Sequence, residues 1–391
     1  MTRPRTVWLV AGEDSGDQLG AKLMRALREM APDATFGGVG GEAMTEAGAE
    51  AGFASLFPLD DVAVMGYLPV LARARTLLRR IRETAGAAVR ARPDVLVIID
   101  SPGFTHAVAK RVRKAAPGIP IIDYVSPSVW AWRPWRAKGM RTFIDHVLAL
   151  LPFEPDAHRR LGGPPCTYVG HPLIERLAEL RPSGAETHRR ETAPHSLVIL
   201  PGSRRSEIER LMPVFGQALE QVFCAHPVEA VLPAVTRHRA LIERLATAWP
   251  VPVRIVTGEA PKYAAFRGAR AALAASGTVT LELALAGVPM VVAYKVSRAE
   301  EVIARRLIQV PTIVLPNLIL AENVMPEFIQ AACTPGRLAE ALAPLLAGGV
   351  AREAQCAALA RIDDRMRLPD ADTPSRAAAR IVLRAAERPS G

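Results

Sequence analysis

Several polar side chains that can do chemistry follow short apolar runs in the first half of the chain. Asp100 closes a run that begins at Val95, and the run Val7–Val10 leads into a glycine-containing turn. Ligands of parallel sheets bind at the carboxyl ends of strands, so Asp100 is a candidate general base and the turn is a candidate binding loop. The alternatives are an aspartate that caps the next helix and an ordinary strand-to-helix connection. The candidate residues of the turn are Gly12, Glu13, Ser15 and Gly16.

An aromatic and basic loop, Tyr124–Arg133, follows another apolar run and contains Ser126 and Trp130. Three of the five tryptophans of the chain lie within Trp130–Trp135. A single tryptophan is usually a core residue, but a cluster interleaved with arginines can also contact a sugar or a lipid. The loop is therefore a second candidate part of a ligand cleft.

Two loops in the second half have the composition of anion sites. Arg204 stands between a predicted strand and a predicted helix, and a guanidinium can bind phosphate through two parallel hydrogen bonds. Ser276, Gly277 and Thr278 open a helix whose free amide groups and dipole favour a diphosphate. Glu282 follows one helical turn later, where a carboxylate can bind ribose hydroxyls. The alternative is a capped helix with a buried glutamate.

The stretch Val62–Arg82 mixes apolar residues with arginines. A basic amphipathic helix of this kind can lie in a membrane interface, whereas the alternative is an ordinary surface helix that packs its leucine face. The most apolar window, Ala271–Tyr294, is interrupted by Glu282 and by glycines, so no transmembrane helix is expected. The candidate membrane contacts are Val64, Met65, Tyr67, Leu68, Arg79 and Arg80.

The composition excludes several classes of protein. Half of the residues are hydrophobic and 23% are charged, which rules out global disorder. The four cysteines form no CxxC pair and no acidic residues and histidines have metal-ligand spacing, so we expect no metal and a structural role for His171. The net charge of +10 favours anionic partners, but the basic residues are dispersed and no nucleic-acid-binding motif is present. The apolar start is too short for a signal peptide, which predicts a cytoplasmic protein.

The order of apolar runs and helix-like segments predicts the α/β class. Continuous apolar strands alternate with helices in both halves, which indicates parallel sheets covered on both faces. The polar stretch 179–195 is interpreted as a linker between a domain over 1–180 and a domain over 190–365, with a helix near 370–391 that packs back on the first. Two such doubly wound domains are expected to face each other across a ligand cleft. The predicted strands are Val7–Val10, Thr35–Val39, Val95–Asp100, Pro120–Val125, Asp145–Leu151, Leu197–Leu200, Glu229–Leu232, Val253–Val256, Ala271–Ala275 and Met290–Tyr294.

In their order along the chain, these motifs resemble those of the lipid-A-disaccharide synthases, which are inverting glycosyltransferases of the GT-B fold. That fold consists of two Rossmann-like domains. The resemblance covers residues 6–330. The similar stretches are GEDSGD, DDVAVMGYLPVL, IIDSPGF, YVSPSVWAWR, LPFE, GHP, LPGSRRSE, ASGTVTLE, GVPMVVAYKV, LPNLI and PEFIQ.

The resemblance implies a hexosyltransferase of lipid A and lipopolysaccharide biosynthesis. UDP-2,3-diacylglucosamine would donate its sugar, with inversion, to the 6-hydroxyl of 2,3-diacylglucosamine 1-phosphate, giving the β-1,6-linked disaccharide 1-phosphate and UDP. It further implies a bacterial enzyme that needs no cofactor and is bound peripherally to the anionic cytosolic face of the inner membrane. A homodimer is compatible with the family.

The resemblance also assigns roles to the two domains. The N-terminal domain would hold the lipid acceptor, with Asp100 as the base. The C-terminal domain would hold the UDP-sugar, and Asn317 and Gln330 match further family positions there. Arg204 and the amino terminus of the helix that begins near Thr278 would stabilise the leaving UDP in place of a metal.

Two departures from the family pattern stand beside these residues. Gly103 and Thr105 replace the aspartate and asparagine that the family often has, so the role of base rests on Asp100 alone. Asp14 adds a negative charge where the family usually has a small or neutral residue. A rival with the same two-domain architecture is a non-hydrolysing UDP-sugar epimerase, which would act on an unacylated sugar.

Overall fold

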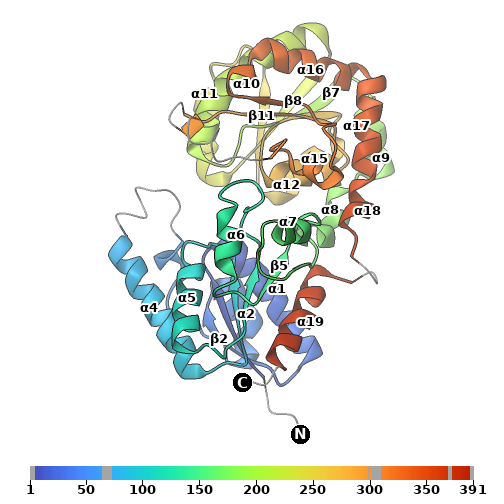
Figure 1. The fold of residues 1–391 in the computed structure, drawn as a ribbon. Coiled ribbons are helices and arrows are strands. Elements are labelled where there is room, and N and C mark those ends of the chain that lie inside the picture. The colour runs from blue at the N-terminus through green and yellow to red at the C-terminus, as the bar shows by residue number, and fades with distance from the viewer. Residues whose placement is uncertain (1–4, 64–72, 298–299, 302–309, 369–371, 388–391) are drawn as a thin grey trace. The chain divides into compact units, whose positions relative to one another are not determined.

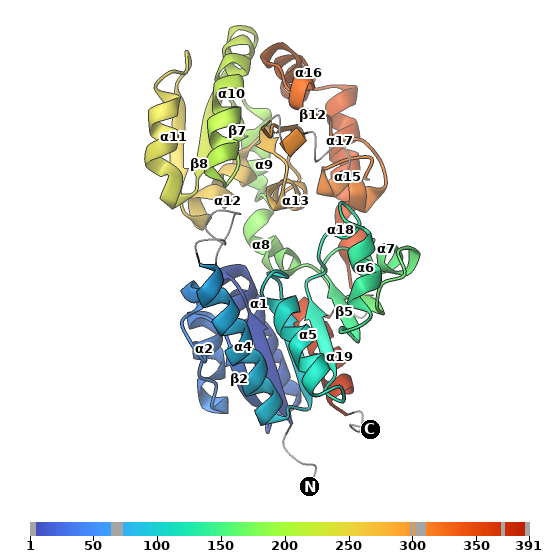
Figure 2. The ribbon, with the colours of Figure 1, turned by 60° about the vertical axis from the view of Figure 1, so that its left-hand side comes forward.

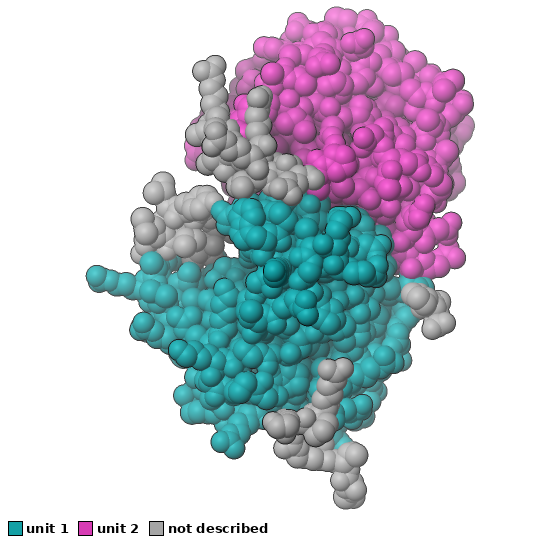
Figure 3. Space-filling view, viewed as in Figure 1, with its two compact units in different colours: residues 1–172, 368–391 teal, residues 173–367 magenta. Residues whose placement is uncertain are grey.

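The computed structural model describes residues 5–63, 73–297, 300–301, 310–368 and 372–387. The chain divides into two compact units (Figure 3). Unit 1 consists of residues 1–172 and 368–391, and unit 2 of residues 173–367.

Unit 1 is built on a six-stranded parallel sheet in the order β2-β1-β3-β4-β5-β6 (Figures 1 and 2). In the central pair of strands, Ala11 at the end of β1 lies opposite Ile99 at the end of β3. The loops after these two strands therefore leave the sheet side by side. The strands are β1 Thr6–Ala11, β2 Thr35–Val39, β3 Val95–Ile99, β4 Ile121–Tyr124, β5 His146–Ala149 and β6 Cys166–Tyr168.

Helices cover both faces of this sheet because its strands are apolar on both sides. Val7 and Leu9 of β1 belong to the core under helices α1 and α19, and Trp8 belongs to the core under α4 and α5. The C-terminal α19 packs beside α1, where Arg376 forms an ion pair with Glu29 at 2.8 Å. The helices are α1 Asp14–Met30, α2 Glu42–Gly48, α4 Ala74–Ala91, α5 Thr105–Ala115, α6 Trp135–Met140, α7 Glu154–Arg160 and α19 Pro374–Ala386.

Unit 2 repeats this plan with a parallel sheet in the order β12-β11-β10-β7-β8-β9. Leu200 at the end of β7 lies opposite Ala274 of β10, so the two predicted anion loops are neighbours. The strands are β7 His195–Leu200, β8 Val228–Ala234, β9 Val253–Thr257, β10 Ala271–Ala275, β11 Met290–Tyr294 and β12 Glu327–Ile329. The helices are α8 Leu177–Leu180, α9 Gly184–Glu191, α10 Arg205–Ala225, α11 Arg239–Ala246, α12 Glu259–Gly268, α13 Thr278–Leu285, α15 Leu315–Leu320, α16 Pro335–Ala347, α17 Val350–Ala360 and α18 Ile362–Met366.

The predicted parallel sheets are confirmed, and the structure adds local detail to two other predicted segments. The expected linker contains α9, whose first turn is closed by a capping box between Ser183 and Glu186. Of the basic stretch Val62–Arg82, the described part consists of Val62 and Ala63, which follow a short 3₁₀ turn at Leu59–Asp61, and of the residues from Arg73 onward, in which helix α4 covers Ala74–Ala91. The three-residue edge strands β6 and β12 were not predicted, because neither contains a continuous apolar run.

Candidate functional site

In unit 1, the polar residues after β1 and β3 meet at the carboxyl edge of the sheet. The Ser15 hydroxyl lies 2.8 Å from Glu13 Oε1 and 3.3 Å from Asp100 Oδ2. Gly12 is required here, since a Cβ at this position would lie 2.5 Å from the Cβ of Ser101. The structure thus brings together the carboxylates of two chain segments that the sequence had identified separately.

The backbone at Asp100 is strained. Asp100 and Ser101 have φ angles of +52° and +45°, which cost on the order of 1–2 kcal/mol for each non-glycine residue. Three hydrogen bonds support this turn: Asp100 N–H donates to Tyr124 O at 3.0 Å, Ser101 N–H donates to Asp100 Oδ1 at 2.7 Å, and Thr105 Oγ1 donates to Asp100 O at 2.7 Å. Thr105, a departure from the family pattern, therefore helps to hold the candidate base.

The charge around this pair of carboxylates is uncompensated. Burial and the neighbouring charge of Asp100 raise the pKa of Glu13 above its ordinary value, although the hydrogen bond from Ser15 opposes the rise. Neither carboxylate forms an ion pair with a lysine or arginine in the part of the chain that the structure describes. Two carboxylates placed together retain a proton more readily than one alone, and such a site can accept a proton from a hydroxyl group.

Residues of the aromatic loop of unit 1 contact helix α7 and the residue that precedes it. Trp130 Nε1 donates to Glu154 Oε1 at 3.0 Å, and its ring packs edge-on against Phe153. The buried Ser126 hydroxyl lies 2.8 Å from His158 Nε2. Glu154 also accepts bonds from two backbone N–H groups, but its burial raises the pKa of its carboxyl to about 7. These contacts hold the loop in place, and a direct contact of Ser126 or Trp130 with acceptor remains a prediction.

Unit 2 contains a pocket of about 500 Å³ at the carboxyl ends of four neighbouring strands. Its walls are the loops after β7, β8, β9 and β10 and the first turns of α12 and α13. All five predicted residues from these loops line it: Arg204, Ser276, Gly277, Thr278 and Glu282. A pocket of this size at these strand ends is typical of nucleotide-binding sites in doubly wound sheets.

The Arg204 side of the pocket is held by a buried carboxylate. Glu207, one turn into α10, forms an ion pair with Arg204 at 2.7 Å and accepts bonds from Ser203 N–H and the Tyr294 hydroxyl. Gly202 has a φ of +110°, and a Cβ there would lie 2.6 Å from Glu207 Oε2. The Arg204 side chain remains 61% exposed, so its guanidinium is accessible to an anion.

The opposite side of the pocket is the amino terminus of α13. Gly277 precedes the helix with a φ of +149°, and Ser276 Oγ donates to Ile313 O at 2.7 Å. The Ser276 hydroxyl is thus used inside the protein, which leaves the amide groups of the first turn as the anion donors. Glu282, one turn later, accepts two bonds from Lys262 Nζ at 2.9 and 3.1 Å.

Sequence reasoning missed the wall contributed by β9 and α12, which includes Gly258, Glu259 and Lys262. The signal was available, because the strand Val253–Val256 was predicted and ligands bind where such strands end. The sequence analysis also missed the wall at the end of β8, Pro233–Thr236, although the strand Glu229–Leu232 was predicted.

Asn317 and Gln330 lie outside the lining of this pocket. The buried Asn317 amide donates to Met325 O at 2.9 Å and accepts from Met325 N–H at 3.0 Å. The Gln330 side chain accepts from Val296 N–H at 2.7 Å and donates to Glu301 at 2.7 Å. Both amides therefore hold loops near β11 and β12, and a nucleotide contact for either one remains a prediction.

The membrane candidates are only partly described. Val64, Met65, Tyr67 and Leu68 lie outside the described residues. Arg80 is bound to Asp61 at 2.5 Å and to Glu83 at 2.7 Å, whereas Arg79 is exposed. Across the described ranges, none of the helices has both the length and the apolar character needed to span a bilayer.

His171 is consistent with the structural role expected for it. It is half-buried, and desolvation lowers the pKa of its imidazole to about 4. No group of three or more metal-ligating side chains occurs among the residues that the structure describes.

Comparison with known proteins identifies relatives over nearly the whole chain. The family model described as lipid-A-disaccharide synthetase matches residues 7–381. The lipid-A-disaccharide synthase of Rhodopseudomonas palustris strain HaA2 is 55% identical over 381 residues, which cover 97% of this chain and 96% of the relative. That of Rhodospirillum centenum is 44% identical, with 97% and 94% covered.

Solved structures share the architecture at low sequence identity. The UDP-GlcNAc 2-epimerase from Neisseria meningitidis, solved bound to UDP-GlcNAc, has a TM-score of 0.61 at 13% identity and covers 97% of this chain and 100% of its own. MurG from Acinetobacter baumannii has a TM-score of 0.58 at 14% identity, with the same coverage. These matches confirm the GT-B fold and, at such identity, carry no further conclusion.

Proposed function

Because this chain belongs to the lipid-A-disaccharide synthase family, we propose that it transfers diacylglucosamine from UDP-2,3-diacylglucosamine to the 6-hydroxyl of 2,3-diacylglucosamine 1-phosphate. The enzyme is a glycosyltransferase that makes the lipid A disaccharide. The observation that carries the substrate proposal is the pocket of unit 2, which combines anion donors with a carboxylate at helical spacing.

The spacing within that pocket fits a nucleoside diphosphate. A helix rises 1.5 Å per residue, so Glu282 lies about 6 Å along α13 from Thr278. A diphosphate at the amino terminus of α13 would face Arg204, and the adjoining ribose would then reach the Glu282 carboxylate. As the bond to the sugar breaks, Arg204 and the helix amide groups stabilise the charge that develops on UDP.

The carboxylates of unit 1 suit the acceptor. Inversion requires one displacement at the anomeric carbon, with removal of the proton from the attacking 6-hydroxyl. Asp100 is the proposed base, and the strained turn fixes the position of its carboxylate. Glu13 and Ser15 adjoin it, so they can orient the acceptor hydroxyl or share its proton.

A peripheral position on the cytosolic face of the inner membrane fits the acylated substrates. Helix α4 supports this proposal, since Arg75, Leu78, Arg79 and Arg82 recur at intervals of three and four residues. All four are exposed, including 46% of Leu78. A basic face with an exposed leucine can bind an anionic bilayer surface.

Product analysis tests the function directly. The purified protein, given a diacylated UDP-glucosamine and the acylated 1-phosphate, should form a β-1,6-linked disaccharide and release one UDP for each disaccharide. Epimerisation of an unacylated UDP-sugar without an acceptor, and with no disaccharide from the acylated pair, would instead assign the chain to the epimerase chemistry of its structural neighbours.

A further inference from the structure

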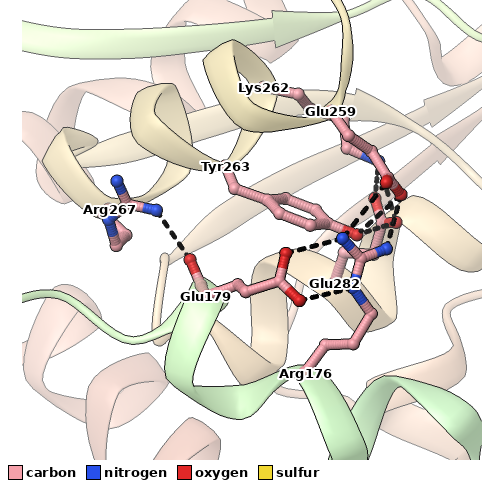
Figure 4. Close-up of polar contacts among 7 residues, drawn as sticks. All are labelled: Arg176, Glu179, Glu259, Lys262, Tyr263, Arg267 and Glu282. Atoms are coloured by element: carbon pink, nitrogen blue, oxygen red, sulfur yellow. Dashed lines mark hydrogen bonds and ion pairs between the residues drawn. The ribbon is translucent and has the colours of Figure 1, made fainter.

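A network of charged side chains connects Glu259 and Glu282, two carboxylates of the unit 2 pocket lining (Figure 4). Lys262 of α12 donates to both oxygens of Glu282, and Arg176 donates to Glu259 at 2.6 and 3.1 Å. The Tyr263 hydroxyl lies between the two carboxylates, 3.4 Å from Glu259 and 3.5 Å from Glu282. These two carboxylates of the pocket lining are therefore each matched by one cation, as Glu207 is by Arg204.

The cations paired with these carboxylates reduce the electrostatic repulsion between the pocket and an anionic ligand. A nucleoside diphosphate is an anion, and two uncompensated carboxylates in the same pocket would repel it. The bonds from Arg176 lower the pKa of Glu259, so this carboxylate stays ionised and paired. Glu282 is only 13% exposed, and Lys262 contributes both the charge and the hydrogen bonds that hold it.

We propose that Lys262 is a positioning residue for nucleotide recognition: it holds the Glu282 carboxylate in the orientation that accepts the two ribose hydroxyls. The proposal rests on the proposed binding of UDP in this pocket. Lys262 Nζ bonds both carboxylate oxygens and the Tyr263 hydroxyl lies near Oε1, so a diol would approach the carboxylate on the side away from Lys262. Lys262 acts through Glu282 and need not contact the nucleotide.

Helix α12 offers a matched control for this role. Arg267 lies on the same helix, and its side chain is 25% exposed compared with 24% for Lys262. Arg267 also forms one ion pair, with Glu186 at 2.7 Å, and donates to Glu179 O, but it does not line the pocket. Removing either cation deletes a comparable interaction of α12, and only one deletion affects Glu282.

The experiment measures the affinities of the full chain for UDP and for 2′,3′-dideoxyuridine 5′-diphosphate by calorimetry. Wild type should bind UDP about 10- to 100-fold more tightly than the dideoxy compound, the range of hydrogen bonds to a charged group. Lys262→Met should reduce this ratio to about threefold or less, mainly by weakening UDP binding. Lys262→Arg should retain most of the ratio, and Arg267→Met should leave it unchanged.

The comparison of ratios separates positioning from general damage. An unchanged ratio in Lys262→Met, even with both affinities lowered equally, overturns the proposal, because Lys262 then acts on the diphosphate or on folding. If Lys262→Met does not fold, Lys262→Gln provides the same comparison. If wild type binds UDP but Arg204→Ala and Glu282→Gln do not affect its binding, the nucleotide lies elsewhere and the proposed function of this pocket fails first.

Discussion

The carboxyl edges of the two sheets have the same architecture, but their carboxylates differ in whether they form ion pairs. In unit 1, Glu13 and Asp100 face each other across the Ser15 hydroxyl without an ion pair among the described residues. In unit 2, the pocket carboxylates Glu259 and Glu282 each bind a cation. The strand ends bring polar residues together in both units, but the neighbouring charges decide what those residues can do.

The difference separates proton transfer from anion binding. Burial and the neighbouring charge of Asp100 raise the pKa of Glu13, which favours exchange of a proton at this group. The paired carboxylates of unit 2 can instead accept hydrogen bonds from a neutral diol beside a diphosphate. Backbone strain also differs between the two units. Asp100 and Ser101 of unit 1 adopt left-handed backbone conformations, whereas the turns of the unit 2 pocket place glycine at positions with positive φ.

The largest effect is expected from removing the proposed base of unit 1, Asp100. Asp100→Asn should lower turnover by about 10²–10⁴-fold, the usual contribution of general acid–base catalysis. The amide keeps the shape of the side chain and can still accept from Ser101 N–H, so the melting temperature should change little. Steady-state kinetics with both lipid substrates measure the effect. Near-normal turnover in a folded mutant would remove Asp100 from the mechanism.

A second experiment compares the stability of the two units as a function of pH. The pKa of Glu154 rises from 4.5 to about 7 on folding, so its stabilising contribution is present below pH 4.5 and is lost as the pH rises through 7. Glu154→Gln mimics the neutral carboxyl, and its unfolding free energy relative to wild type should therefore increase by about 2–3 kcal/mol between about pH 5 and pH 8. Denaturant unfolding at both pH values measures it.

Glu186→Gln in unit 2 should show the opposite pH dependence of the free energy of unfolding relative to wild type. Its hydrogen bonds, chiefly from Ser183 N–H, lower the pKa of Glu186 to about 2. The wild-type contribution is then present above pH 4.5 and is lost as the pH falls through 2. This mutant should be less stable than wild type at neutral pH, and the two should converge in acid. The same pH trend in both mutants would contradict the opposite pKa shifts of the Glu154 and Glu186 carboxyls.

The anion side of the unit 2 pocket should show a smaller effect. Arg204→Ala should weaken UDP binding by about 1.5 kcal/mol, the low end for a charged hydrogen bond, because its side chain is largely exposed. Arg205→Ala is the neighbouring control, since Arg205 pairs with Glu209 and does not line the pocket. Calorimetry with UDP measures both variants. Equal affinities for wild type and Arg204→Ala would place the diphosphate elsewhere.

The smallest effect per residue is expected at the basic face of α4. Arg75→Glu with Arg79→Glu should release the protein from anionic vesicles in a flotation assay, since each arginine near the surface contributes about 1 kcal/mol at low salt. Arg244→Glu with Arg254→Glu, two exposed residues of unit 2, makes the same change in net charge. If the α4 double mutant floats as wild type does, the docking surface is elsewhere, and the next candidate is Trp130–Trp135.

The sequence by itself determined the elements and the positions of the loops that bear the sites. Thr35–Val39, Ala271–Ala275 and Met290–Tyr294 have the predicted bounds, because continuous apolar runs are local properties of the chain. The rule that ligands bind where parallel strands end then selected Asp100, Arg204 and Glu282 without knowledge of their neighbours.

Only the tertiary structure decided which side chains are partners. Lys262 reaches Glu282 from another helix, Trp130 donates to Glu154, and Arg80 is held by Asp61 instead of being free for a membrane. No periodicity in the sequence records such pairs, because they form between segments that packing brings together. The ion pairs determine the net charge around each cluster of carboxylates. The sequence therefore locates the two candidate sites, while the fold determines which charges surround them.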